Sequence, residues 1–379
     1  MNNPSKKAWI LVPQIRSLEY FPPLITWINF MCSKGYRFVL MSHKIDRNSY
    51  QFPDQIVFVE ISGHAYPLNL AGKISLKIQA AICLYKILKQ HSFELIWVCV
   101  WDFKYLRTLL NHFGFKGKVV YQFLELDPAN FPYCKYADHI VVPEENRAWL
   151  TYFMAKLPAK PWYLPNIPLV PNFPNPIIPE VLQTLVKENR IIVFYSGLID
   201  FYKRCLSELI SAIGKLDERY CLVIMPGRNP DTRLLEQIEK QTKSLGAEGK
   251  VFLLESMPAP SHLSVFQYAS IGIGLYRPSS LNQVYAAPNR IYEFTAFDVP
   301  VVLPNFPQFV GLENKYPYGI VTVDPENIED ITEKLHLLGQ HGIMEKARES
   351  ATKYFSENGH YEHFASIIAK KLFGPHFDA

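Results

Sequence analysis

The chain has 379 residues, 49% hydrophobic and 20% charged, so a folded protein is expected rather than a disordered one. This length exceeds one ordinary hydrophobic core and suits two. The six cysteines are widely spaced and form no CxxC pair, which predicts buried free thiols in a reducing compartment. The sequence has no signal-peptide pattern and no apolar run of about 18 residues or more, so a cytoplasmic protein is expected.

Charge is unevenly distributed along the chain, whose net charge is +4. Residues 1–160 carry 19 lysines and arginines against 11 aspartates and glutamates, whereas the remainder carries 20 against 24. A basic half followed by an acidic half indicates an anionic partner or surface for the first half, or a solvated imbalance without a partner.

Short apolar runs alternate with amphipathic stretches. In the first half, strands are predicted at 9–12, 37–42, 56–61, 95–100, 119–124 and 139–142, with helices near 23–32, 74–89, 105–112 and 145–154. In the second half, strands are predicted at 191–195, 221–225, 251–254, 271–275, 300–303 and 320–323, with helices near 206–216, 232–245, 261–268, 289–297 and 328–338, and a last helix at 361–373. This alternation predicts an α/β protein with two Rossmann-like, doubly wound parallel sheets.

A proline-rich stretch divides the pattern. Eight prolines lie between residues 158 and 179, which predicts an extended, semi-rigid connector. We therefore predict a Rossmann-like domain over residues 1–160, a linker over 161–188, a second Rossmann-like domain over 189–355, and a C-terminal helix within 356–379 that packs back on the first domain. Ligands of such sheets bind beyond the carboxyl ends of the strands, so the active site is expected in a central cleft that the two domains face.

The strongest candidate site follows the strand predicted at 271–275. Pro288 precedes a helix whose first free N–H groups, near Asn289, can bind a phosphate. Arg290 adds a cation suited to phosphate oxygens, and Glu293, about one turn further, can accept hydrogen bonds from both hydroxyls of a ribose. An ordinary amphipathic helix with an N-terminal proline explains the same residues.

This segment resembles the PNK-x-x-E-[YF]-x-A-x-x-x-P-V-[VI] region of GT-B glycosyltransferases, especially the family-4-like group. The matching residues are Asn289, Arg290 (for the usual lysine), Glu293, Phe294, Ala296, Pro300, Val301 and Val302. Asp298 stands where glycine is common, and Tyr285 stands where the first glutamate of the E-x7-E pair is expected. The resemblance implies the GT-B fold and a donor ribose held by Glu293, while Tyr285 leaves the stereochemical course of transfer open.

A second match lies at the start of the C-terminal half. The strand ending at Gly197, followed by Lys203, Arg204 and the helix from Leu209 to Ala212, is similar to the family's G-x(5)-K-G…L-I-x-A stretch. In the family its basic residue contacts the donor diphosphate. Alignment by the glycine selects Lys203, and alignment by the helix selects Arg204.

The candidate donor-binding residues that the resemblance implies are Gly197, Lys203, Arg204, Glu255, Tyr276, Asn289, Arg290 and Glu293. Glu255 and its neighbours end a strand where backbone groups of the family usually meet the base. The nucleotide sugar, a UDP- or GDP-sugar, is then a substrate, and neither a cofactor nor a metal is expected.

Carboxylates that follow the strands of the first half are candidates for a general base acting on an acceptor hydroxyl. They are Glu19, Asp102, Glu125 and Asp127. Glu125 is the first choice because an almost wholly apolar strand precedes it, which favours partial desolvation. Each of them also fits a turn or capping carboxylate.

Aromatic and basic residues interleave in the first half. They include Phe21, Trp27, Phe30, Lys34, Tyr36 and Arg37, then Phe103, Lys104, Tyr105, Arg107, Phe113, Phe115, Lys116 and Lys118. This pattern suits peripheral contact with the inner face of a membrane or a lipid-diphosphate acceptor, and core aromatics with solvated lysines explain it equally well. No nucleic-acid-binding module is recognisable, so no nucleic-acid partner is expected.

The function implied is a hexosyltransferase-type glycosyltransferase of polysaccharide biosynthesis. It would move a sugar from a nucleotide-sugar donor to a hydroxyl of a glycan or lipid-linked saccharide without a metal. Two alternatives stay open: a non-catalytic GT-B-like subunit that binds a partner transferase or glycan, and a sugar-nucleotide epimerase of the same architecture.

Overall fold

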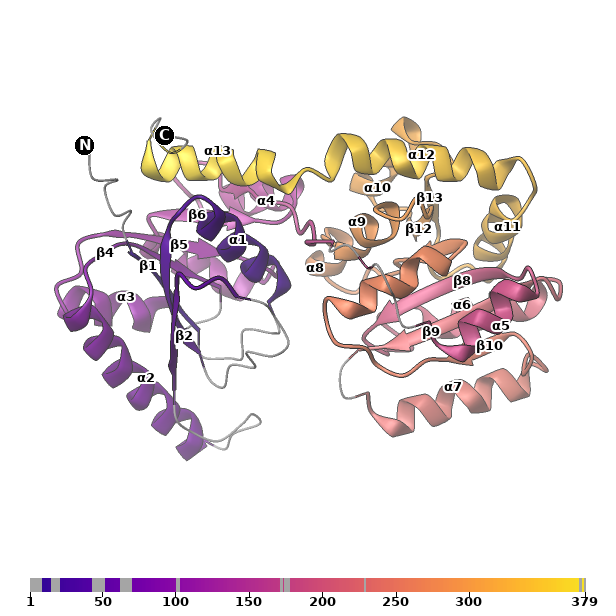
Figure 1. Ribbon diagram of the computed structural model, residues 1–379, viewed down its shortest axis with the longest axis horizontal. Helices are drawn as coiled ribbons and strands as arrows, with labels where there is room; N and C mark the ends of the chain where they lie inside the picture. Colours follow the sequence, from indigo (N-terminus) through magenta and orange to yellow (C-terminus); the bar gives the residue numbers. More distant parts are fainter. Residues whose placement is uncertain are drawn as a thin grey trace. The chain divides into compact units, whose positions relative to one another are not determined.

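The computed structural model describes residues 9–14, 21–42, 52–61, 70–99, 103–170, 173, 178–227, 230–374 and 377. The chain divides into two compact units (Figure 1). Unit 1 comprises residues 1–166 together with 361–379, and unit 2 comprises residues 167–360. The chain therefore crosses between the units after Asn166 and again after His360.

Unit 1 contains a parallel sheet of seven described strands in the order β3-β2-β1-β4-β5-β6-β7. The strands are β1 (Trp9–Pro13), β2 (Arg37–Ser42), β3 (Ile56–Glu60), β4 (Phe93–Val98), β5 (Lys118–Gln122), β6 (His139–Val142) and β7 (Trp162–Tyr163). The order reverses between β1 and β4, as in a Rossmann sheet. The short edge strand β7 lies in the stretch expected to be a linker.

Unit 1 buries four of the eight aromatic residues that the sequence left open between core and membrane, namely Phe21, Trp27, Phe30 and Tyr36. The helices of unit 1 are α1 (Pro22–Ser33), α2 (Leu70–Gln90), α3 (Phe103–His112), the 3₁₀ helix η2 (Pro128–Tyr136), α4 (Glu145–Met154) and α13 (Tyr361–Phe373). Trp27 is fully buried and stacks on Trp97, with 4.3 Å between ring centroids. Phe30 and Tyr36 are also buried. These aromatics are therefore core residues.

Helix α13 packs on unit 1 although it follows unit 2 in the chain. Tyr361 lies edge-on to Phe30, and Phe373 lies 4.6 Å from Tyr36, both measured between ring centroids. The Lys118 ammonium donates a hydrogen bond to the carbonyl of Leu372 at 2.9 Å. The last helix thus completes the core of unit 1.

Unit 2 contains a parallel sheet of six described strands in the order β10-β9-β8-β11-β12-β13. The strands are β8 (Ile191–Gly197), β9 (Tyr220–Pro226), β10 (Val251–Leu253), β11 (Ile271–Ile273), β12 (Val301–Pro304) and β13 (Ile320–Val323). Along β8, Ile192 and Phe194 enter one hydrophobic core, whereas Val193 and Tyr195 enter another. Both faces of this sheet are therefore covered, as its apolar strands predict.

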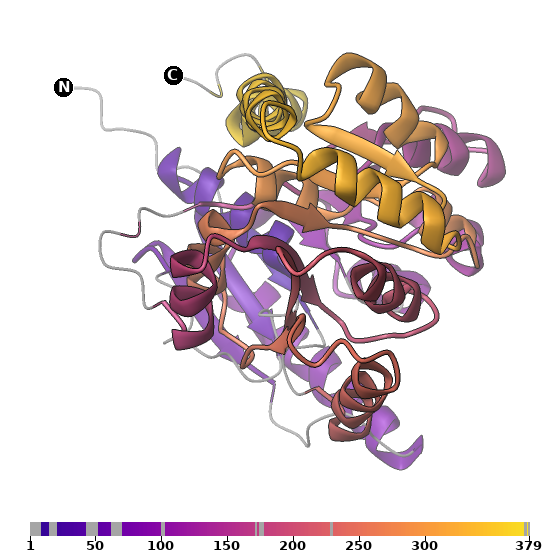
Figure 2. The same cartoon turned by 90° about the vertical axis from the view of Figure 1, so that its right-hand side faces the viewer.

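Helices lie on both sides of the unit 2 sheet (Figures 1 and 2). They are α5 (Glu180–Lys187), α6 (Leu206–Lys215), α7 (Thr232–Ser244), the 3₁₀ helix η3 (Ser261–Tyr268), α8 (Leu281–Val284), α9 (Asn289–Thr295), α10 (Pro307–Lys315), α11 (Ile328–Leu338) and α12 (Ile343–Asn358). Helix α5 occupies part of the stretch expected to be extended, because Leu182 and Leu185 give it an apolar face that is buried in the core.

The predicted fold class, two Rossmann-like parallel sheets in an α/β chain, is confirmed. Residue bounds of β2, β6, β13, α4, α11 and α13 agree with the sequence prediction.

Candidate functional site

Several of the predicted donor residues follow the two strands between which the strand order of unit 2 reverses. Strands β8 and β11 are neighbours, while their connections run in opposite directions along the sheet. Gly197 is the last residue of β8, and Tyr276 follows β11. The carboxyl ends of parallel strands at such a switch point form the usual ligand-binding position of an open α/β sheet.

Gly197 makes room for Arg290 at this edge. Its φ of +121° lies in a region that residues with a Cβ rarely adopt. A Cβ built on it would lie 1.8 Å from Nη2 of Arg290, so no larger residue fits while that guanidinium keeps its position. Gly197 and Arg290, from the two separate sequence matches, are therefore in direct contact.

Two arginines lie on tyrosine rings around this turn. The guanidinium carbon of Arg290 is 5.3 Å from the ring centroid of Tyr195, and that of Arg204 is 4.3 Å from the ring centroid of Tyr276. Such contacts hold a guanidinium in place without neutralising it. Both arginines are half-buried, and neither pairs with a carboxylate among the described residues. Nη1 of Arg204 is buried, and no described residue forms a hydrogen bond with it.

The Tyr195 hydroxyl lies close to both cations. It donates a hydrogen bond to the carbonyl of Leu198, and the side chain is fully buried. Burial raises the pKa of this hydroxyl, and the positive charges of Arg290 and Arg204 oppose that shift. The sequence analysis gave Tyr195 no role. The feature that could have indicated one is its position, two residues before the glycine that ends the strand.

Glu293 lies one turn from Arg290 on α9. Burial raises the pKa of its carboxyl group from 4.5 to about 7, and the charge of Arg290 only partly offsets this effect. Within the described part of the chain, neither a hydrogen bond nor an ion pair holds the carboxyl group. The carboxyl group is therefore partly buried, yet able to accept hydrogen bonds from a ligand.

Helix α9 is fixed by its apolar residues. Phe294 is fully buried and stacks on Phe266, with ring centroids 4.6 Å apart. Its ring lies so close to Gly272 of β11 that a Cβ on residue 272 would approach the ring to 2.4 Å.

Asn289, a predicted donor residue, is the first residue of the seven-residue helix α9. Asp298, at the glycine position of the family pattern, has a φ of +59° and accepts a 2.6 Å hydrogen bond from Thr352.

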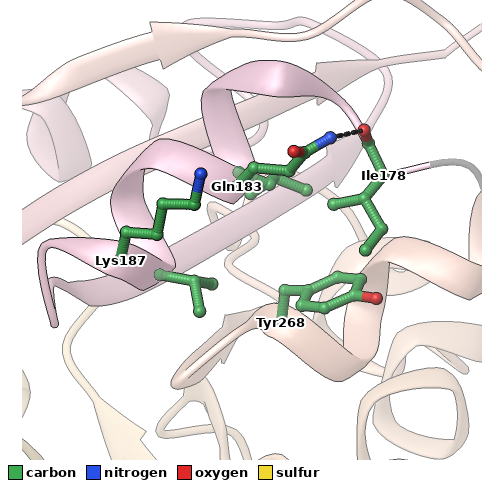
Figure 3. A pocket seen from close by; sticks show the side chains of 6 residues that line it. Ile178, Gln183, Lys187 and Tyr268 are labelled. Atoms are coloured by element: carbon green, nitrogen blue, oxygen red, sulfur yellow. Dashed lines mark hydrogen bonds between the residues drawn. The ribbon is translucent and has the colours of Figure 1, made fainter.

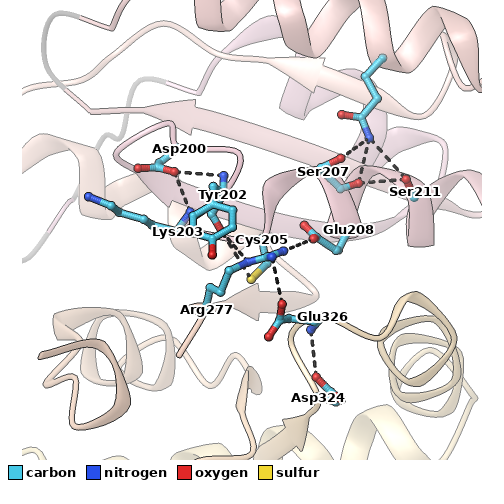
Figure 4. A network of polar contacts seen from close by, with 11 residues as sticks. Asp200, Tyr202, Lys203, Cys205, Ser207, Glu208, Ser211, Arg277, Asp324 and Glu326 are labelled. Atoms are coloured by element: carbon cyan, nitrogen blue, oxygen red, sulfur yellow. Dashed lines mark hydrogen bonds and ion pairs between the residues drawn. The ribbon is translucent and has the colours of Figure 1, made fainter. Parts of the chain in front are cut away.

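An ion-pair network holds the loop that carries Lys203 (Figure 4). At its centre, Arg277 pairs with Glu208 of α6 and, at 2.9 Å, with Glu326. The Arg277 backbone N–H donates to the carbonyl of Lys203 at 3.0 Å, and its Nε donates to the carbonyl of Tyr202 at 3.1 Å. Arg277 was not predicted, because its partners come from distant parts of the chain.

Lys203 and Glu255 are exposed, in contrast to the two arginines. The Lys203 backbone N–H donates to the Asp200 carboxylate at 2.7 Å. Glu255 follows β10, which is separated from β8 by β9. Glu255 therefore follows a strand two positions away from β8 in the sheet.

The carboxylates predicted in unit 1 have different surroundings. Glu125 is exposed, so the partial desolvation predicted for its carboxylate is not found. The reason is that β5 ends at Gln122, three residues before Glu125. Asp127 is the N-cap of η2 and accepts a hydrogen bond from the Ala129 backbone N–H at 2.9 Å. Asp102 and Glu19 lie outside the described residues.

A surface hollow of about 370 Å³ lies apart from these residues (Figure 3). It is formed by α5 and η3, and its walls include Ile178, Lys187 and Tyr268. None of the predicted donor residues lines it.

In the part of the chain that the structure describes, no group of three or more His, Cys, Asp or Glu residues could hold a metal ion. None of the described helices combines the length and hydrophobicity of a transmembrane segment.

Comparison with known proteins supports the architecture. The chain matches no protein-family model and no curated protein sequence. It is similar to sucrose-phosphate synthase from Thermosynechococcus elongatus, with a TM-score of 0.70 and 13% identity over 96% of this chain and 98% of the other. A glycosyltransferase from Rickettsia africae ESF-5 gives a TM-score of 0.67 and 15% identity over 97% and 99% of the two chains. Anabaena HepE in complex with UDP and glucose gives a TM-score of 0.68 and 13% identity over 97% of this chain and 99% of the other. At these identities the likeness shows the fold, and the chain has the GT-B fold.

Proposed function

We propose that the chain is a family-4-like glycosyltransferase that moves a sugar from a nucleotide sugar to a hydroxyl of a glycan or lipid-linked acceptor. The observation that carries the proposal is the pair of half-buried arginines, Arg204 and Arg290, at the switch point of unit 2. Two cations held beside the buried Tyr195 without a carboxylate among the described residues are costly unless an anion completes the site. The diphosphate of a nucleotide sugar supplies such an anion.

The roles of the residues follow from their chemistry. In the proposed reaction, the bond between the sugar and the diphosphate breaks, and negative charge develops on the departing diphosphate. Arg204 and Arg290 stabilise that charge, so the step needs no metal ion. Glu293, once ionised, accepts hydrogen bonds from the two ribose hydroxyls. The structural neighbour HepE was solved with UDP and glucose, which agrees with a UDP-sugar as the donor, and a GDP-sugar is the other candidate.

A general base must remove the proton of the acceptor hydroxyl. Glu125 is proposed for this role, since its exposed carboxylate is accessible to an acceptor. Asp127 is a weaker candidate, because one of its oxygens caps η2. Asp102 stays a candidate from the sequence alone.

Calorimetric titration with UDP, GDP, CMP and dTDP, followed by transfer assays with the corresponding nucleotide sugars, tests the proposal. Arg290→Ala and Glu293→Ala should each weaken nucleotide binding at least tenfold. Arg219→Ala is the matched control, because Arg219 is an exposed arginine of unit 2 paired with Asp217. If none of the four nucleotides binds, or if all three variants bind alike, the proposal fails.

A non-catalytic subunit is the second candidate. It is favoured by Tyr285, which ends α8 at the position where the first glutamate of the family's pair is expected. A nucleotide would then bind without turnover. Donor hydrolysis or transfer by the purified chain, lost in Glu125→Gln or Asp102→Asn, would rule this candidate out.

A further inference from the structure

Helix α2 of unit 1 presents a second apolar face to the outside. One face, formed by Leu76, Ala80, Leu84 and Ile87, is buried against the unit. The other consists of Leu70, Ile74, Ile78, Ile82 and Tyr85, whose exposed fractions are 75%, 51%, 53%, 52% and 44%. We call these five residues the α2 stripe. The first four are spaced by four residues, so they form one continuous row along the helix.

Such a row of exposed branched side chains is unusual for a surface helix. Scattered apolar residues on a surface need no explanation, but a contiguous apolar row marks an interaction site. The stripe differs in this respect from the aromatic residues of α1, which are buried in the core. Some partner is therefore expected to cover the α2 stripe.

The charges of α2 identify the kind of partner. Four lysines lie on the helix, at positions 73, 77, 86 and 89, and all are exposed, while residues 70–90 include no aspartate or glutamate. By helical periodicity Lys77 and Lys86 flank the stripe on opposite sides, and Lys89 lies over the Tyr85 ring at 5.6 Å. Apolar side chains bordered by lysines and a tyrosine match the boundary between acyl chains and anionic headgroups.

We propose that the α2 stripe docks unit 1 onto an anionic lipid surface, with its isoleucines in the acyl boundary and its lysines on the headgroups. Of the residues that the sequence suggested for membrane contact, Trp27, Phe30 and Tyr36 are buried, whereas Phe113 is half-buried and its ring centroid lies 5.2 Å from that of Tyr85 in the stripe. The inference does not depend on the proposed transfer reaction, since every residue of the stripe lies in unit 1 and the donor residues lie in unit 2.

Flotation of the full chain with vesicles tests the inference. Vesicles of phosphatidylcholine with about one third phosphatidylglycerol should bind the protein at least tenfold more strongly than pure phosphatidylcholine, and high salt should weaken this binding. The double variant Ile78→Glu with Ile82→Glu should lose at least tenfold in vesicle binding. Lys86→Gln with Lys89→Gln should lose about tenfold on the anionic vesicles alone.

Ile367→Glu is the matched control. Ile367 is an isoleucine of the same unit, 43% exposed on α13, and its replacement should leave vesicle binding unchanged. Unchanged melting temperatures and UDP titrations would show that the stripe variants are folded and separate this result from the donor site. The inference is overturned if the parent chain binds neutral and anionic vesicles equally, or if the double isoleucine variant still floats like the parent. It is also overturned if that variant changes only the oligomeric state, since the stripe then joins two copies of the chain.

Discussion

Replacing Glu293 by glutamine should stabilise unit 2 at neutral and alkaline pH while it weakens nucleotide binding. Burial raises the pKa of the Glu293 carboxyl group from 4.5 to about 7, so ionisation is less favourable in the folded chain than in the unfolded one. One pKa unit corresponds to about 1.4 kcal/mol, so the ionised carboxylate lowers the free energy of unfolding by about 3 kcal/mol. Glutamine has nearly the same shape and carries no charge.

The pH window follows from the direction of the shift. Below pH 4.5 the carboxyl group is protonated in both states and has no effect on stability. Between pH 4.5 and about 7 the unfolded chain releases the proton while the folded chain keeps it, so the parent protein loses stability as the pH rises. Above pH 7 the loss is complete. The stability gap between Glu293→Gln and the parent should therefore grow from near zero at pH 4.5 to about 3 kcal/mol at pH 8.

Urea unfolding at several pH values measures this gap. All six tryptophans, at positions 9, 27, 97, 101, 149 and 162, belong to unit 1, so tryptophan fluorescence follows that unit, whereas far-ultraviolet circular dichroism follows both units. The variant should shift the transition of unit 2. A Glu293→Gln protein that is no more stable than the parent at pH 8, or that shows an equal gap at pH 4.5, would refute the reasoning.

The affinity for a nucleotide sugar should rise with pH, whereas the stability of the parent protein falls. Only the ionised carboxylate accepts hydrogen bonds from both ribose hydroxyls, and with a pKa of about 7 its ionised fraction rises about tenfold between pH 6 and pH 8. The affinity of the parent for a nucleotide sugar should increase by up to that factor, and Glu293→Gln should be weaker and nearly independent of pH. A nucleotide sugar is the suitable probe, because its diphosphate is esterified at both ends and therefore does not itself change charge between pH 6 and pH 8.

Three further substitutions test the packing around the site. Gly197→Ala should lower the melting temperature and weaken nucleotide binding at least tenfold, because the added Cβ would overlap Nη2 of Arg290. Gly227→Ala is its control and should change little, because the added Cβ would be 3.5 Å from its nearest neighbouring atom. Arg204→Gln should weaken diphosphate binding at least tenfold in calorimetry without loss of stability, and a strong loss of stability would instead indicate a structural role. Phe294→Ala should cost about 3–5 kcal/mol in urea unfolding, and a cost below about 1 kcal/mol would contradict the packing of α9.

The fold was predictable from the sequence because its strands are apolar and its helices are periodic. Residues 139–142 and 320–323, for example, are short apolar runs, and they form β6 and β13 with the expected bounds. Helix α12 (Ile343–Asn358) was not predicted, and other errors occur where proline dominates the pattern. Prolines on both sides of Trp162–Tyr163 and before Glu180–Lys187 indicated an extended linker, whereas these segments form β7 and α5, because each packs on a neighbouring element.

The contacts of the candidate site were predictable only where a short motif carries them. Gly197, Arg204 and Arg290 lie within two local patterns, and these patterns meet in the folded unit. Arg277 was missed, since its partners Glu208 and Glu326 are set by tertiary structure. For the same reason the sequence could not predict how exposed each carboxylate is, and Glu125 proved to be accessible to solvent.

The return of α13 to unit 1 has a consequence for the order in which the chain folds during synthesis. Unit 2 is one continuous segment, 167–360, and can bury its core as soon as that segment has left the ribosome. Unit 1 has to wait, because the rings of Tyr361, Phe373 and Phe377, which contact Phe30 and Tyr36, are available only when residues 361–377 emerge. The first half of the chain to be translated is therefore the last to be completed. A chain truncated after residue 360 would contain all of unit 2 together with a unit 1 that lacks the aromatic partners supplied by α13.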